Sequence, residues 1–216
     1  MKLVILPERL KDGFRSLLRP IIRFFIVLNL NPNFLTTVSL ILCFMSAYQF
    51  AKGSLRLAAL LLILGGIFDM IDGSVARATN RVTRFGALYD STLDRYAEIA
   101  IFLGIGWYFI RQYDTSSALG AIAVMGVFLG LAGSIMVSYV RARAEGLDFE
   151  CKVGLMQRPE RLVVISVAAL ISEYVLIGGL AIIALFANFT AIQRVYYIWA
   201  KENAEKWAKV SDAPHE

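Results

Sequence analysis

The chain has 216 residues, of which 58% are hydrophobic and 18% are charged, and its mean hydropathy is +0.63. A soluble domain carries about 25% charged residues, so the composition excludes an ordinary soluble domain and indicates a membrane protein. The formal net charge is +5. Its basic residues lie in short segments beside apolar runs, without the aromatic-rich basic module that binds single-stranded nucleic acid. We therefore expect membrane lipids, and no nucleic acid, as partners.

Residues 1–31 form a segment that we expect to lie in the cytoplasmic membrane interface. Charged side chains interrupt residues 1–20, so no cleavable signal peptide is expected. Leu and Phe alternate there with Arg and Lys at near-helical spacing, which is typical of an amphipathic helix lying in the interface.

Residues 32–200 are predicted to form the membrane domain, followed by a polar cytoplasmic tail at residues 201–216. A membrane-spanning helix needs roughly 20 mostly apolar residues. We count six apolar stretches, of which the fifth is shorter and is divided from the sixth only by a short break. They are residues 34–51, 55–78, 84–113, 117–141, 159–173 and 175–198. The predicted fold is an all-α integral membrane protein with six transmembrane helices and an N-terminal interfacial helix.

The distribution of Lys and Arg predicts how the chain is oriented in the membrane. Nineteen of these residues fall on the side that holds both termini, and three, Lys52, Arg56 and Arg111, fall on the other. Cytoplasmic segments carry the excess of Lys and Arg. We therefore expect a multi-pass protein of the cell membrane with both termini on the cytoplasmic side.

The fourth apolar stretch contains the sequence GVFLG, with Gly126 and Gly130 four residues apart. Small residues at this spacing allow helices to approach closely. The pattern predicts tight packing inside the bundle or, alternatively, a contact between two copies of the chain.

Four aspartates lie near the ends of the second and third stretches. Asp69 and Asp72 are three residues apart, and Asp90 and Asp94 are four apart, so each pair shares one helix face. A turn near residues 79–84 would fold the two helices antiparallel. All four carboxylates would then meet at the cytoplasmic ends of these helices.

Ionised carboxylates at membrane depth are costly and mark functional cavities. Protonation, as in a proton pathway, pairing with nearby arginines, or one or two divalent cations could each compensate their charge. Oxygen ligands without His or Cys favour Mg²⁺, Mn²⁺ or Ca²⁺ over Zn²⁺. The structural alternative is a salt-bridge network that only closes the helix pair.

Two glycines and one arginine accompany the acids. Gly73 leaves the backbone bare beside Asp72, and Gly86 lies four residues before Asp90 on the same face. Each glycine costs about 1 kcal/mol in a helix interior relative to alanine, which indicates that something bulky lies against these helices. Arg77 can offer a fork of donors to a phosphate, so the group indicates a nucleotide pyrophosphate.

The stretch DMIDGSVARATNRVTRFGALYDSTLD resembles the signature of the CDP-alcohol phosphotransferases, D-x₂-D-G-x₂-A-R-x₈-G-x₃-D-x₃-D, at every fixed position. These positions are filled by Asp69, Asp72, Gly73, Ala76, Arg77, Gly86, Asp90 and Asp94. The resemblance implies an enzyme that transfers a phosphoalcohol group from a CDP-alcohol to a hydroxyl acceptor and releases CMP.

The resemblance also implies roles for these residues. Two divalent ions, Mg²⁺ or Mn²⁺, would be held by Asp69, Asp72, Asp90 and Asp94. Asp94 would in addition be the catalytic general base. The CDP-binding residues would be Gly73, Ala76, Arg77 and Gly86, and a homodimer is expected.

The stretch SYVRARAEGLDFECKVGLMQRPERL resembles the prokaryotic phosphatidylinositol-phosphate synthase branch, although Gln157 replaces the first Glu of its ER-x-ER-like element. This implies that CDP-diacylglycerol is the donor and inositol 1-phosphate the acceptor. Arg141, Arg158 and Arg194 would bind the acceptor phosphate. Anchoring by the positive-inside rule is the structural alternative for these arginines.

Other functions remain open at this point. Glycerol 3-phosphate would make the chain a phosphatidylglycerophosphate synthase, and an archaeal lipid donor would make it an archaetidylinositol-phosphate synthase. A transporter or proton-conducting protein is the alternative of a different class, but a proton path does not require glycines at fixed spacing. Glu98 continues the face of Asp90 and Asp94 outside the signature, and its role is open.

Overall fold

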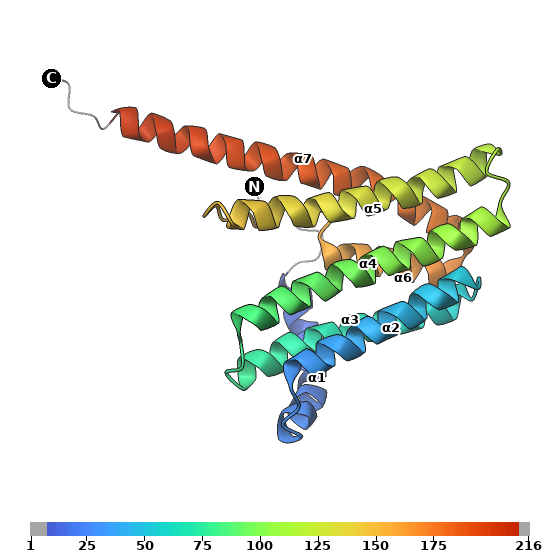
Figure 1. The fold of residues 1–216 in the computed structure, drawn as a ribbon, viewed down its shortest axis with the longest axis horizontal. Helices are drawn as coiled ribbons and strands as arrows, with labels where there is room; N and C mark the ends of the chain where they lie inside the picture. The colour runs from blue at the N-terminus through green and yellow to red at the C-terminus, as the bar shows by residue number, and fades with distance from the viewer. Residues whose placement is uncertain (1–7, 212–216) are drawn as a thin grey trace.

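The computed structural model describes residues 8–211, and within this range all regular secondary structure is α-helical (Figure 1). The helices are α1 (Glu8–Val27), α2 (Pro32–Ala51), α3 (Leu55–Ala78), α4 (Arg84–Gln112), α5 (Ala118–Glu145), α6 (Arg158–Ile171) and α7 (Glu173–Ser211). Residues 1–7 and 212–216 of the predicted terminal segments lie outside the described range.

Side-chain caps set where several helices begin. The hydroxyl of Thr83 accepts a hydrogen bond from the Gly86 N–H (2.9 Å) at the start of α4, and Ser117 does the same for Gly120 (3.1 Å) at the start of α5. Asn31 caps α2 in the same way. Each cap satisfies one N–H that lacks a partner within the helix, which stabilises the helix by about 1 kcal/mol.

The helices form one elongated bundle (Figure 1). Helix α2 packs against α3 and α4, and α5 packs against α7 and α4. The short α6 contacts α3 and α7, while α1 contacts α3. The C-terminal part of α7, red in Figure 1, extends beyond the other helices.

Glycines of α5 permit its close approach to α7. A Cβ added to Gly126 would lie 3.4 Å from Leu180 Cβ, and one added to Gly133 would lie 2.9 Å from the Asn188 backbone N. A Cβ on Gly130 would lie 2.9 Å from the Phe102 ring. The prediction of tight packing inside the bundle is therefore confirmed for the GVFLG segment.

Three helices are long and apolar enough to cross a membrane by length and composition among the described residues: α2, α5 and residues Glu173–Ala204 of α7. The all-helical, membrane-type fold is thus confirmed. Helices α3 and α4 carry the acidic residues of the site, and α6 has only 14 residues.

Candidate active site

Helices α3 and α4 run antiparallel and are joined by residues 79–83. Asn80 takes a left-handed conformation in this turn (φ 53°), which Asn adopts more readily than most residues. The turn brings the acidic ends of both helices together. Asp69, Asp72 and Asp90 each offer a carboxylate oxygen, and these oxygens all lie within 4.8 Å of one another.

This three-carboxylate group fits a hard divalent cation. Asp72 is only 5% exposed. Its Oδ2 and the Oδ1 of Asp90 are buried without a hydrogen-bond partner among the described residues. Buried anionic oxygens without donors are costly, and a bound cation removes that cost. Carboxylate oxygens are the ligands that Mg²⁺ and Mn²⁺ prefer.

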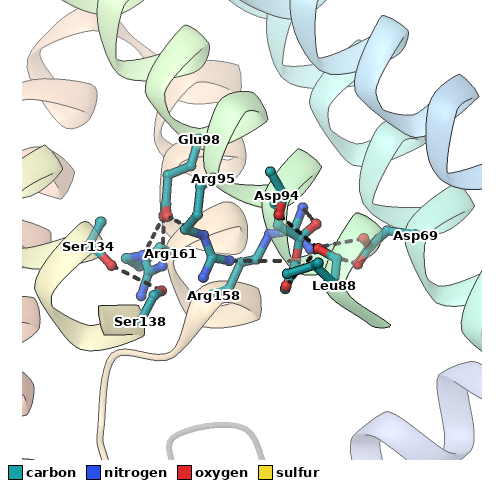
Figure 2. Close-up of polar contacts among 11 residues, drawn as sticks. Asp69, Leu88, Asp94, Arg95, Glu98, Ser134, Ser138, Arg158 and Arg161 are labelled. Carbon is teal, nitrogen blue, oxygen red and sulfur yellow. Dashed lines mark hydrogen bonds and ion pairs between the residues drawn. The ribbon is translucent and has the colours of Figure 1, made fainter. Parts of the chain in front are cut away.

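Asp94 lies one turn beyond Asp90 and is engaged differently. Its Oδ1 lies 2.6 Å from Nη2 of Arg158, and its Oδ2 lies 3.5 Å from Nη2 of Arg95. Nη1 of Arg158 donates to both carboxylate oxygens of Asp69 at 2.9 Å. Figure 2 shows Arg158 of α6 reaching between Asp69 of α3 and Asp94 of α4. The role of Asp94 as a metal ligand and base stays a prediction.

A cavity of about 280 Å³ adjoins the carboxylates. It is lined by Pro32, Asn33, Thr36, Asp72, Gly73, Ala76, Arg77, Arg81, Val82, Thr83, Gly86, Ala87 and Asp90. All four residues predicted to bind CDP are in this wall, beside two of the predicted metal ligands. The arrangement can accept an anionic group between the acids and Arg77 once a cation is bound.

The two signature glycines keep different spaces open. A Cβ on Gly73 would lie 3.4 Å from Nη1 of Arg77, so this glycine borders the cavity beside the guanidinium. A Cβ on Gly86 would lie 2.9 Å from Thr83 Oγ1 and 3.4 Å from Asn33 Oδ1. Gly86 therefore also permits the cap of α4 and the close approach of α2.

The three arginines predicted to bind the acceptor phosphate have different surroundings. Arg141 is exposed on α5 and donates through Nε to Glu145 (2.8 Å). Arg194 is 2% exposed and donates to the carbonyl oxygens of Val153 (2.8 Å) and Val137 (2.5 Å). Only Arg158 contacts the predicted metal ligands directly among these three. Their common role stays a prediction.

The sequence did not predict the ion pair between Arg161 and Glu98: it assigned no role to Arg161 and left the role of Glu98 open. Nε and Nη2 of Arg161 both lie 2.7 Å from Oε1 of Glu98, and both side chains are buried. The available signal was the spacing, because Glu98 lies four residues after Asp94 and Arg161 three after Arg158.

Pocket residues from α2 were also missed. Asn33 and Thr36 line the cavity and come from the NPNFLT segment that opens this helix. Their polar side chains near the start of an apolar helix were the available signal.

The chain matches known proteins over most of its length. The family model described as CDP-alcohol phosphatidyltransferase matches residues 29–201. The archaetidylinositol phosphate synthase of Methanothermobacter thermautotrophicus is 34% identical over 201 residues, covering 89% of this chain and 97% of that protein. The phosphatidylinositol phosphate synthase of Corynebacterium glutamicum is 34% identical over 198 residues, covering 89% of each chain.

Solved structures agree with this match. The phosphatidylinositol phosphate synthase of Mycobacterium tuberculosis with CDP-DAG bound superposes with a TM-score of 0.73 at 30% identity, covering 83% of this chain and 92% of that one. The structure of the same enzyme with manganese and citrate gives a TM-score of 0.75 at 29% identity, with coverage of 83% and 88%.

The matched range includes the segment that carries the whole aspartate signature, and six of its eight fixed positions line one cavity in the structure. A divalent cation, Mg²⁺ or Mn²⁺, is the cofactor that this donor set and the manganese-bound relative indicate. The chain is a transferase and belongs to the CDP-alcohol phosphatidyltransferase family.

Proposed function

We propose that the chain transfers the phosphatidyl group of CDP-diacylglycerol to a phosphorylated polyol, with inositol 1-phosphate as the acceptor, forming phosphatidylinositol phosphate and CMP. One observation carries the proposal: Asp69, Asp72 and Asp90 form a carboxylate cluster, and two of them, Asp72 and Asp90, line a cavity that Arg77 also lines. The phosphatidylinositol phosphate synthases among the relatives support the choice of acceptor.

The chain's own residues would bind the donor nucleotide at this cavity. Arg77 donates to a phosphate of the CDP group, while Gly73 and Ala76 leave room along α3 and Gly86 along α4. Asp69, Asp72 and Asp90 would hold the metal, with Asp94 completing the ligands for two ions. When bound, the cations neutralise the pyrophosphate and the charge that develops during transfer.

Asp94 would be the general base of the reaction. Its carboxylate takes the proton of the acceptor hydroxyl, and the oxygen forms a bond to the β-phosphorus of the donor. The bond between this phosphorus and the bridging oxygen breaks, and CMP leaves with the electron pair. Arg158, which lies 2.6 Å from Asp94, holds the acceptor beside the base.

Nη1 and Nη2 of Arg158 already contact Asp69 and Asp94, so the acceptor phosphate would bind the remaining N–H groups of this guanidinium. Arg141 lies at the end of α5, and its side chain is 46% exposed, so it is free to turn toward a bound phosphate. Arg194 already donates Nε and Nη1 to backbone carbonyls. Its contribution would come from Nη2 and from its positive charge.

We propose that α2–α7 cross the membrane and that α1 lies in the cytoplasmic interface. The 14 residues of α6 span about 21 Å, less than the roughly 30 Å of the hydrocarbon core, so residues 153–157, next to α6, would complete this crossing. The excess of Lys and Arg favours cytoplasmic termini and a cytoplasmic active site. Membrane lipids and a second copy of the chain would be its further partners.

An acceptor series tests the function. Purified protein in detergent–lipid micelles receives CDP-diacylglycerol, Mg²⁺ and, separately, inositol 1-phosphate, inositol, glycerol 3-phosphate or serine, and CMP release is measured. We expect release with inositol 1-phosphate and a product with the mass of phosphatidylinositol phosphate. Release only with glycerol 3-phosphate would assign phosphatidylglycerophosphate synthesis instead.

Archaetidylinositol phosphate synthesis is a second candidate, because the relative from Methanothermobacter carries that name. A parallel series with CDP-archaeol separates the two donors by their relative kcat/KM. No CMP release with any donor and acceptor would contradict the enzymatic function and leave the transporter or proton-conducting alternative.

A further inference from the structure

Two neighbouring ion pairs connect α4 to α6. Asp94 pairs with Arg158, and Glu98 pairs with Arg161 (Figure 2). Residues four apart on α4 and three apart on α6 lie on one face of each helix, so the second pair repeats the first one turn deeper. The backbones of α4 and α6 are not closely packed, and the side chains bridge the space between them.

The deeper pair is withdrawn from solvent. Arg161 is 1% exposed and Glu98 is 5% exposed. The desolvation of two charges offsets much of their attraction, so a buried ion pair contributes little net stability compared with apolar residues of similar size. What the pair does fix is geometry, because only one register of α4 against α6 brings both charges together.

Arg161 also fixes the segment that enters α6. Its Nη1 donates to the carbonyl oxygen of Met156 at 2.9 Å. The Met156 N–H in turn donates to the Thr190 hydroxyl of α7 (3.2 Å). Met156 lies two residues before Arg158, the first residue of α6, so this contact holds the backbone from which Arg158 reaches the carboxylates.

We propose that Glu98 and Arg161 are positioning residues that set the specificity for a phosphorylated acceptor. They hold the guanidinium of Arg158 between Asp69 and Asp94, and they act through Arg158 because Arg161 is too deeply buried to touch a substrate. This inference rests on the proposed function, in which Arg158 binds the acceptor phosphate.

The test removes both charges of the pair, while Arg95, which lies 3.9 Å from Glu98, keeps its contact with Asp94. The double variant Glu98→Leu/Arg161→Met replaces both residues by apolar side chains of similar combined volume, a change that folded proteins commonly tolerate. Thermal unfolding in detergent checks the fold, and KM is measured for CDP-diacylglycerol and for inositol 1-phosphate. We expect the acceptor KM to rise at least tenfold and the donor KM to stay within threefold of the wild-type value.

A matched control removes another contact made by α4. Tyr108 donates to Glu173 of α7 at 2.5 Å, and it lies 14 residues, about 21 Å along the helix, from Asp94. Tyr108→Phe deletes this contact, and we expect both KM values to remain within twofold of wild type.

Arg161→Lys tests the positioning role of the pair if the double variant does not fold. Lysine keeps the charge opposite Glu98 but lacks the fork that also reaches the Met156 carbonyl. We expect a three- to tenfold increase of the acceptor KM alone. A folded double variant with the wild-type acceptor KM, or an equal rise of both KM values, would overturn the proposal. Wild-type protein that releases no CMP with inositol 1-phosphate would instead overturn the proposed function.

Discussion

Arg158 and Asp94 form a 2.6 Å ion pair between α6 and α4, and the same guanidinium donates to both oxygens of Asp69 on α3. A single arginine thus links three helices at the edge of the candidate metal centre. Its positive charge compensates part of the negative charge of the carboxylates. The charge that the site can offer to a metal therefore depends on where Arg158 lies.

Arg158→Met is expected to strengthen Mn²⁺ binding. Two charges 4 Å apart interact by about 4 kcal/mol at the effective dielectric constant near a protein surface, and rearrangement reduces the net effect. We expect Kd for Mn²⁺ to fall roughly tenfold, which corresponds to about 1.4 kcal/mol. Titration followed by electron paramagnetic resonance measures free Mn²⁺ directly.

Arg158→Lys is the control for that change, because it keeps the charge and should leave the affinity for Mn²⁺ close to the wild-type value. Weaker Mn²⁺ binding by Arg158→Met would mean that Arg158 mainly orients the carboxylates. In that case the electrostatic account of the site would be wrong.

Asp94→Asn is expected to abolish turnover while the protein still binds CMP. The amide has nearly the shape of the carboxylate but cannot take a proton from the acceptor, and general base catalysis contributes typically 10²–10⁴-fold. Initial rates of CMP release and equilibrium binding of CMP provide the two measurements. Asp114→Asn, an exposed change in the α4–α5 connection, is the control and should leave both values unchanged. Turnover by Asp94→Asn within threefold of wild type would remove Asp94 as the base.

Gly73→Ala is expected to keep or raise the stability of the protein and to weaken the binding of the donor. The added Cβ would lie 3.4 Å from Arg77, an ordinary contact, and alanine favours a helix interior by about 1 kcal/mol relative to glycine. The variant should unfold at an equal or higher temperature. The methyl group would nevertheless occupy the wall of the cavity, so KM for CDP-diacylglycerol should rise at least fivefold.

Gly178→Ala provides the matched control for this glycine. A Cβ there meets nothing within 4 Å, so the variant should gain a similar stability without any change of KM. A Gly73→Ala protein with an unchanged donor KM would show that the nucleotide does not lie against this part of α3.

Local signals predicted much of the fold. Helix α3 matches the expected range 55–78 at both ends, and α2, α4, α5 and α6 begin and end within four residues of the expected stretches. Hydropathy placed the end of the last stretch at residue 198, whereas α7 continues to Ser211. The sequence AKENAEKWAK contains good helix formers without Gly or Pro, so helix propensity extends the helix beyond its apolar part.

The spacing of the aspartates predicted that four carboxylates meet, because residues three and four apart share a helix face and a short turn reverses the chain. Asp69, Asp72 and Asp90 form such a group, whereas Asp94 contacts Arg158. The position of Arg158 could not be predicted in this way. It lies 89 residues from Asp69 along the chain, and its contact depends on how α6 packs across α3. The carbonyl contacts of Arg194 likewise depend on the path of residues 151–157, which no local pattern specifies.

The proposed orientation predicts which loops a membrane-impermeant maleimide reaches from outside the cell. Both native cysteines, Cys43 and Cys151, are buried and should react slowly. The labelling of an introduced cysteine can therefore be measured against a low background. Ser116→Cys in the α4–α5 connection should react in intact cells. Lys152→Cys between α5 and α6, where the lysine side chain is 67% exposed, should react only after the membrane is made permeable. A gel shift measures the labelled fraction for both variants and for the wild-type chain. Labelling of Lys152→Cys in intact cells, and of Ser116→Cys only after permeabilisation, would place the carboxylates and the cavity on the outer side.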